Sequence, residues 1–328
     1  MKYFLTGATG FVGGRMARLL RSKNHEVVAI VRTPDKANDL KDIGVTIVKG
    51  DVTDKESMRK PMMGCDGVFH IAGWYKIGVR DKTPGQKVNI DGTRNVLELM
   101  KELHIPKGVY TSTLAVNSDT HGQLYDETFH FTGKHLSEYD RTKAAAHHIA
   151  NKFIQQGLPL IIVMPGLIYG PGDTSMSGDS IRDYLRKKLP MLPKKSAYCW
   201  AHVDDIVMAH WLAMEKGKSG ETYIICGPPH TLTEAYQLAE KITGIPAPRF
   251  VSPTMMSVSA AFAAVIEKVF PLPELYSSES LRVIAGHTYL GNNSKAKQEL
   301  GYNPRDLESG LRETLTYEMK ELGIRKEL

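Results

Sequence analysis

The chain has 328 residues, of which 42% are apolar and 24% carry a charge. These are ordinary globular values, so they exclude wholesale disorder, a collagen-like repeat and a disulfide-rich scaffold, and the length predicts one large domain or two smaller ones. The net charge is +6, but Lys and Arg are spread along the sequence, so we expect no nucleic-acid partner.

The cysteines and the two ends of the chain predict a cytoplasmic protein. Cys65, Cys199 and Cys226 are far apart and lack the spacing of a zinc or redox motif, which favours free thiols in a reducing compartment and no metal site. The apolar run at the N-terminus is too short for a signal peptide. Residues 325–328 resemble an endoplasmic-reticulum retention signal, which we interpret as chance because no export signal is found.

Short β-branched apolar runs alternate with amphipathic helical patterns through the first half of the chain. This alternation predicts an α/β fold of the Rossmann type, a doubly wound parallel sheet with right-handed crossovers and helices on both faces. The expected strands are Tyr3–Thr6, Val27–Val31, Thr46–Val48, Gly67–Ile71, Gly108–Thr111 and Leu160–Met164.

After Pro165 the pattern changes to turns rich in Gly and Pro and to isolated helices. We therefore expect a nucleotide-binding domain at 1–165 and a smaller, mostly helical substrate-binding region at 166–197 and 227–328. Residues 198–226 are expected to return to the first domain, because they contain a helical pattern at 203–214 and a strand-like run at 222–226.

Residues 255–269 are nearly uncharged. The stretch is shorter than the roughly 20 residues that span a bilayer, so we expect no stable membrane span. We expect a helix that is buried or packed over the pocket, and contact with a membrane surface is the alternative.

A glycine-rich turn follows the first expected strand and opens a helix. Gly7, Gly10 and Gly13 are spaced by three residues, and small residues there let the backbone approach a pyrophosphate at the helix N-terminus. We expect Gly7, Thr9, Gly10, Phe11 and Val12 to bind a dinucleotide.

The residues after the second expected strand predict which dinucleotide is bound. A carboxylate there would favour NAD, whereas this chain has Arg32, whose guanidinium can hold a 2′-phosphate through two hydrogen bonds. We therefore expect NADPH or NADP+, with NAD as the alternative. Lys36 is expected to assist, and Asp35 is interpreted as a helix-start residue.

Tyr139 and Lys143 are one helical turn apart on an expected helix, so they share a face. A phenol titrates near pH 10, and a neighbouring ammonium group would lower its pKa and make it a usable acid and base. Thr113, after the fifth expected strand, is expected to donate a hydrogen bond to a substrate carbonyl, with Ser112 as the reserve candidate.

Together these residues resemble an extended short-chain dehydrogenase/reductase of the NAD(P)-dependent epimerase/dehydratase type, over essentially the whole chain. The resemblance rests on the glycine turn, Thr113, Tyr139 with Lys143, and further segments listed here: Gly50-Asp51, His70-Ile71-Ala72-Gly73, Asn89-Ile90-Asp91-Gly92-Thr93, Pro165 to Asp173 and His202-Val203-Asp204-Asp205. It implies that Asp51 and Val52 lie beside the adenine, that Ala72 and Pro165 contact the cofactor and that Lys143 also holds the nicotinamide ribose. It also implies a homodimer formed through helices that flank the sheet.

Departures from the family's patterns limit which of the family's reactions we expect this chain to catalyse. Sugar-nucleotide dehydratases resemble this chain but have an Asp-Glu pair after the catalytic Thr, where Leu114-Ala115 stands here. Many epimerases have an Arg for the substrate diphosphate at the position of Tyr198. Other cations are candidates to replace it: Arg182, Lys187, Lys188, Arg249 and Arg282.

The chain most closely resembles the dihydroflavonol-4-reductase-like branch. The segments that carry this likeness are Val31-Arg32, Tyr198-Cys199-Trp200 and His70 to Tyr75. Trp74 and Tyr75 are expected either to border the substrate or to pack in the core. His70 is interpreted as a structural histidine.

The leading hypothesis is an NADPH-dependent oxidoreductase that reduces a small-molecule ketone or aldehyde, or oxidises the alcohol, with Tyr139 as the proton donor. The alternatives are an NAD-dependent sugar-nucleotide epimerase and a protein that senses NADPH without catalysis. The sequence contains no motif that identifies the substrate.

Overall fold

The computed structural model describes residues 1–270, 272 and 274–324. The retention-like sequence at 325–328 lies outside the described residues.

A seven-stranded parallel sheet forms the centre of the fold, as the sequence predicts. Its strands, in the spatial order β10-β6-β5-β4-β1-β2-β3, are assigned as follows in chain order: β1 Lys2–Thr6, β2 Glu26–Val31, β3 Thr46–Lys49, β4 Gly67–His70, β5 Gly108–Thr111, β6 Leu160–Pro165 and β10 Thr222–Ile225.

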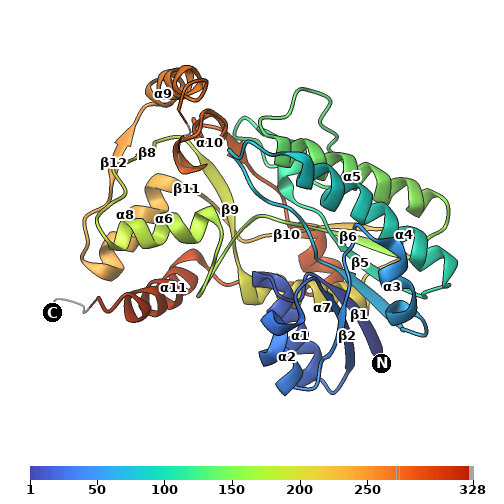
Figure 1. Ribbon diagram of the computed structural model, residues 1–328. Helices are drawn as coiled ribbons and strands as arrows, with labels where there is room; N and C mark the ends of the chain where they lie inside the picture. The colour runs from blue at the N-terminus through green and yellow to red at the C-terminus, as the bar shows by residue number, and fades with distance from the viewer. Residues whose placement is uncertain (271, 273, 325–328) are drawn as a thin grey trace.

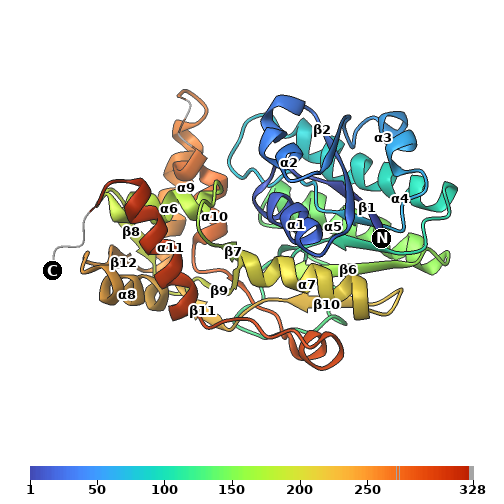
Figure 2. The ribbon, with the colours of Figure 1, turned by 90° about the horizontal axis from the view of Figure 1, so that it is seen from below.

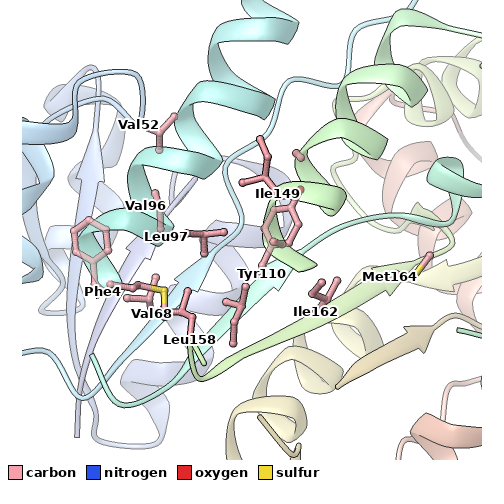
Figure 3. Close-up of a cluster of buried hydrophobic side chains, with 14 of the residues drawn as sticks. Phe4, Val52, Val68, Val96, Leu97, Tyr110, Ile149, Leu158, Ile162 and Met164 are labelled. Carbon is pink, nitrogen blue, oxygen red and sulfur yellow. The ribbon is translucent and has the colours of Figure 1, made fainter. Parts of the chain in front are cut away.

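Side chains of the central strands alternate between two buried layers. In β1, Phe4 packs into one apolar cluster, whereas Tyr3 and Leu5 pack into the other on the opposite face. Figure 3 shows the first cluster, in which Phe4 lies among side chains from the neighbouring strands and helices. Burial on both faces is why these strands are continuous apolar runs.

Helices cover both faces of the sheet (Figures 1 and 2). One face is covered by α1 (Phe11–Ser22), α2 (Asn38–Asp42) and α7 (Val203–Lys216). The other is covered by α3 (Lys55–Met62), the π-helical η2 (Gly85–Gly92), α4 (Thr93–Glu102) and α5 (Glu138–Gln155).

The remaining elements form a smaller unit beside this sheet (Figure 2). Its strands are β7 (Leu167–Tyr169), β8 (Met191–Pro193), β9 (Ala197–His202), β11 (Pro229–Thr231), β12 (Arg249–Val251) and β13 (Thr288–Tyr289). Its helices are α6 (Met176–Leu185), α8 (Leu232–Thr243), α9 (Pro253–Ile266), α10 (Ser278–Ile284) and α11 (Leu307–Glu321). The short helices of the chain are η1 (Pro34–Ala37), η3 (Leu114–Asn117), η4 (Glu274–Tyr276) and the π-helical η5 (Ala296–Leu300).

The chain crosses between the two units more than once. After β9, which pairs with β7, β11 and β13, it returns as α7 and β10 to the seven-stranded sheet. The division into a nucleotide-binding domain and a substrate-binding region at the expected boundaries stays a prediction.

The expected burial of residues 255–269 is wrong for most of this segment. In α9 only Met256 and Ala263 are buried, whereas Val258, Phe262 and Val265 are largely exposed. The helix packs against α10, at the edge of the smaller unit. Among the described residues, no helix is long and apolar enough to cross a membrane.

A cavity of about 650 Å³ lies between the two units. It is lined by residues that follow β1, β2, β4, β5 and β6, and the sheet order reverses between β1 and β4. Open parallel sheets bind ligands at this place, outside the carboxyl ends of the strands at the point where the strand order reverses.

Candidate active site

The glycine turn between β1 and α1 forms one end of the cavity, and its backbone is closely packed. Gly7 has a φ of +76°, and a Cβ there would lie 2.8 Å from the amide nitrogen of Ala72. A Cβ on Gly13 would lie 2.1 Å from the carbonyl oxygen of Gly7. Gly10 precedes α1 with no side-chain cap, so the amides of the first helical turn remain available to an anion. This cradle fits a dinucleotide pyrophosphate.

The ends of β2 and β3 line the same part of the cavity. Arg32 is exposed to solvent and borders the cavity beside Asp51 and Val52. The Asp51 carboxylate accepts hydrogen bonds from the amide and hydroxyl of Thr53, both at 2.9 Å. Lys36, which was expected to assist Arg32, is not among the residues that line the cavity.

Tyr139 and Lys143 lie on the first turns of α5 and line the cavity. The helix begins here because the Ser137 side chain accepts a hydrogen bond from the amide of Asp140. Lys143 is buried and donates to the carbonyl oxygen of Thr111 at 2.7 Å. Thr113 follows β5, its hydroxyl oxygen accepts a hydrogen bond from the amide of Ala115 at 3.2 Å, and its side chain is close enough to the Tyr139 phenol to affect the pKa of that phenol.

Burial dominates the protonation of this pair. It raises the pKa of Tyr139 to about 12, although the nearby Thr113 side chain acts in the opposite direction. Burial also lowers the pKa of Lys143 to about 7. In the chain by itself burial therefore outweighs any lowering of the phenol's pKa by Lys143, and near neutral pH the phenol keeps its proton.

An apolar wall surrounds Tyr139 on the side of the smaller unit. Ala115, Val283 and Tyr289 form a buried cluster against which Tyr139 and Tyr198 pack. Trp74 and Tyr75 also line the cavity. The amide of Trp74 donates to the Asn89 side chain at 2.7 Å, and Tyr75 is 51% exposed at the surface.

A buried carboxyl group lies next to the phenol, and sequence reasoning missed it. Asp140 accepts a hydrogen bond of 3.2 Å from the hydroxyl of Tyr289, whose ring stacks on Tyr198 at 5.7 Å between centroids. Burial raises the pKa of Asp140 to about 7, and the negative charge of nearby Glu279 acts in the same direction. The position of Asp140 directly after Tyr139 was the available signal, whereas nothing in the sequence singled out Tyr289.

The sequence profile of the NAD dependent epimerase/dehydratase family matches residues 3–226, which contain the glycine turn, Thr113, Tyr139 and Lys143. The chain belongs to this family. It is an extended short-chain dehydrogenase/reductase and an NAD(P)-dependent oxidoreductase.

Relatives within the family are similar over nearly their whole lengths. A Synechocystis sp. protein, provisionally named dihydroflavonol 4-reductase, is 31% identical over 94% of this chain and 92% of its own. Sterol demethylase protein B of Methylococcus capsulatus is 27% identical over 99% and 100%. A Stigmatella aurantiaca ketoreductase, named for a farnesyl dihydroquinoline oxide, is 27% identical over 93% and 92%.

Solved structures of the family share the fold. The crystal structure of gox2253 superposes with a TM-score of 0.83 and 27% identity, covering 99% of each chain. A UDP-glucuronic acid 4-epimerase variant from Bacillus cereus, in complex with UDP-4-deoxy-4-fluoro-glucuronic acid and NAD, has a TM-score of 0.79 at 21% identity, covering 98% of this chain and all of its own. This second likeness shows the fold alone.

With the exception of Lys36, the site residues expected from the sequence line one cavity. These residues are Gly7, Thr9, Gly10, Phe11, Val12, Arg32, Asp51, Val52, Ala72, Trp74, Tyr75, Thr113, Tyr139, Lys143 and Pro165. Their roles in binding and catalysis remain proposals.

Two further polar residues near the family motifs have structural partners. His70 is buried and hydrogen-bonds Thr6 at 2.8 Å and Thr93 at 3.1 Å, and burial lowers its pKa to about 3. This agrees with its interpretation as a structural histidine. Ser112, the reserve candidate for Thr113, hydrogen-bonds His147 at 2.8 Å.

The cations named as candidates to replace an epimerase's arginine lie elsewhere. None of Arg182, Lys187, Lys188, Arg249 and Arg282 is among the residues that line the cavity. Arg182 instead donates to the carbonyl oxygen of Asp173 at 2.7 Å and pairs with Asp179. Within the described part of the chain, the cations that line the cavity are Arg32 and Lys143.

Another cluster, His202, Asp204 and Glu313, has metal-ligand atoms within 4.8 Å of one another. Asp204 pairs with Arg15 at 3.2 Å, and Glu313 pairs with Arg305 at 2.7 Å. Because these cations already neutralise the carboxylates, we assign no metal to this cluster.

Proposed function

We propose that this enzyme reduces a ketone or aldehyde to an alcohol with NADPH, or runs the reverse oxidation, and that its substrate is largely apolar. The observation that carries the proposal is the protonated Tyr139 phenol, which faces a cavity with an apolar wall at one end and the dinucleotide cradle at the other.

The two ends of the cavity have different roles in this proposal. The glycine turn holds the pyrophosphate, and Arg32 selects the phosphorylated cofactor because its exposed guanidinium can form two hydrogen bonds with a phosphate. Asp51 and Val52 border the adenine, and Ala72 and Pro165 border the nicotinamide half. The bound nicotinamide supplies the hydride to the carbonyl carbon.

The protein's own side chains supply the proton and the orientation. Tyr139 donates its proton to the carbonyl oxygen as negative charge develops there, and its raised pKa keeps that proton in place beforehand. Thr113 hydrogen-bonds the same oxygen and aligns it with the phenol. Lys143, fixed by the Thr111 carbonyl, holds the ribose and stabilises the phenolate that remains.

The substrate end of the cavity supports a reductase over a sugar-nucleotide epimerase. A diphosphate carries two negative charges, and burying them without cations is costly. The cations of the cavity, Arg32 and Lys143, belong to the dinucleotide end, and Tyr198 stands where an epimerase would present Arg. Three relatives whose names describe reduction of a carbonyl compound or processing of a sterol agree with an apolar substrate.

Substitution of Tyr139 by Phe tests the proton donor. We expect the kcat of carbonyl reduction to fall at least 100-fold, because the variant has no proton to donate, while the affinity for NADPH stays within about threefold. Tyr75→Phe is the matched control, since Tyr75 lies at the cavity surface and has no role in proton transfer. A Tyr139→Phe variant that keeps most of its turnover would refute this proposal.

A further inference from the structure

The helix α9 presents its large apolar side chains to solvent. Met255, Val258, Phe262 and Val265 follow one another at intervals of three or four residues, and Ile266 is four residues after Phe262, so all five lie on one side of the helix. Their exposed fractions range from 45% to 66%. The buried positions, Met256 and Ala263, lie on the side that faces the protein. This is the reverse of an ordinary surface helix, whose large apolar residues face the core.

Exposed apolar residues continue along the chain past the end of α9. Val269 is 71% exposed, Phe270 is 65% exposed, and Tyr276 is exposed a few residues later. We call these eight residues, the five on α9 with Val269, Phe270 and Tyr276, the apolar face. Single exposed apolar residues are common, but several large apolar side chains exposed on one side of a helix mark a binding surface.

The polar groups of α9 are adapted to apolar surroundings. The helix contains no ionisable side chain between Pro253 and Ile266. The hydroxyls of Ser257 and Ser259 donate to the backbone carbonyls of Pro253 and Met255, each at 3.0 Å. These two side chains therefore need no water partner if the helix enters a lipid phase.

Shape and charge at this surface favour a membrane over a protein groove. Figure 2 shows α9 projecting beyond the rest of the smaller unit. Three basic residues near α9 are exposed: Arg80, Lys268 and Arg282. Among the described residues, two nearby acids, Asp81 and Glu267, form no ion pair with a lysine, so the cations are in excess. A projecting apolar helix with a modest excess of cations matches the interfacial region of a bilayer that contains anionic lipid.

The apolar face is joined to the wall of the catalytic cavity. Helix α10 packs on α9, and its Val283 belongs to the cluster around Tyr139. The segment that contains Tyr75 is attached to the same region, because Arg80 donates to the carbonyl oxygen of Glu267 and Lys82 pairs with Glu279. A molecule that leaves the bilayer beside α9 would therefore meet the border of the cavity.

We propose that the apolar face of α9 inserts into the surface of a lipid bilayer and brings the cavity close to substrates dissolved in it. The docking itself rests on this surface alone, whereas the link to substrate access rests on the function proposed above.

Vesicle co-sedimentation tests the docking. The full chain is mixed with vesicles of phosphatidylcholine, with or without 30% phosphatidylglycerol, and compared with the variant Val258→Gln/Phe262→Gln/Val265→Gln. We expect the wild type to bind both kinds of vesicle, more strongly with the anionic lipid, and the triple variant to lose at least tenfold in partitioning. Gln is a good helix former, and the three positions are exposed, so the fold should be kept.

Met63→Gln/Leu124→Gln is the matched control, because these residues are 57% and 54% exposed and lie outside the apolar face. It should bind vesicles as the wild type does. A wild type that binds neither kind of vesicle, or a triple variant that binds unchanged, overturns the proposal. Sedimentation equilibrium without lipid tests whether a second copy of the chain covers the apolar face instead. Self-association that the triple variant abolishes, together with no vesicle binding, would assign the face to that second copy.

Activity measurements separate this proposal from the proposed function. The triple variant should reduce a water-soluble carbonyl compound at the wild-type rate, and Tyr139→Phe should still bind vesicles. If the wild type reduces the carbonyl compound but does not bind vesicles, the docking proposal has failed. If it binds vesicles but does not reduce the compound, the proposed function has failed.

Discussion

At the scale of single residues, Thr113 illustrates how a hydroxyl at a strand end can be tested separately from the proton donor. Thr113→Ala removes the hydroxyl that would orient the substrate carbonyl beside Tyr139, so we expect kcat for carbonyl reduction to fall by a factor on the order of 10 to 100. Thr113→Ser keeps the hydroxyl and should recover most of that loss. Equal rates in the Ala and Ser variants, from steady-state kinetics at saturating NADPH, would exclude a role for the hydroxyl.

Asp140 makes a second residue-level prediction, on stability. Its pKa is raised from 3.8 to about 7, so the native state holds a proton that the unfolded state releases between these pH values. The stability that this proton contributes is present at acid pH and is lost as the pH rises through 7. Asp140→Asn has no such group but keeps an oxygen for the Tyr289 hydroxyl.

Urea unfolding at pH 4.5 and pH 7 measures this contribution. The free energy of unfolding of wild type minus that of Asp140→Asn should fall by on the order of 2 to 3 kcal/mol between the two pH values. Buried His70 and His147 titrate in both proteins, so their contribution cancels in the difference. Asp126→Asn is the control, since the pKa of exposed Asp126 is lowered and its titration lies below this range. A constant difference for Asp140→Asn would contradict the raised pKa.

At the scale of elements, the contact between α1 and the glycine turn sets the position of the helix N-terminus. Gly13→Ala places a Cβ 2.1 Å from the Gly7 carbonyl oxygen, so α1 must move away from the turn. We expect a loss of stability of about 1 to 3 kcal/mol and at least a tenfold loss in NADPH affinity, measured by urea unfolding and fluorescence titration.

Gly14→Ala is the matched control one position further along α1. Its Cβ would lie 3.2 Å from the Ala8 carbonyl oxygen, which requires a shift of only a few tenths of an ångström. Its NADPH affinity should stay near that of the wild type. If Gly13→Ala binds NADPH as tightly as Gly14→Ala does, the close approach of helix and turn has no part in binding.

The sequence predicts the buried central strands more fully than it predicts the surroundings of helix α9. The runs at Val27–Val31 and Leu160–Met164 become central strands because their apolar side chains are buried on both faces, so composition and structure agree. Helix α9 has an even more apolar composition but lies at the surface. Periodicity predicts the helix. The side of the helix that meets the protein is set by its packing against α10, a tertiary contact that no local sequence pattern indicates.

At the scale of the whole molecule, the site depends on segments that are far apart in the chain. Motifs between Gly7 and Pro165 predict the dinucleotide end of the cavity, because each follows a strand of one sheet and all strands end at the same edge. The substrate end also uses Tyr198, Val283 and Tyr289 from the smaller unit. No motif marks these residues, since an apolar wall requires only size and shape.

The coupling of cofactor binding to global stability gives the last prediction. A ligand that binds only the native state at 100 times its Kd adds about 2.7 kcal/mol to the free energy of unfolding, so NADPH should raise Tm by several degrees. At equal concentrations NADH should raise Tm less, because NADH has no 2′-phosphate for Arg32 to bind.

Arg32→Ala should reduce the NADPH shift in Tm to the NADH value, whereas Lys36→Ala should leave it unchanged, since Lys36 is outside the cavity lining. Differential scanning fluorimetry of the three proteins makes the comparison. A wild type stabilised more by NADH, or one that retains NAD through purification, would reverse the cofactor assignment. Tight retention of NAD would also favour the epimerase, because that reaction returns the hydride to the same bound molecule and needs no exchange of cofactor.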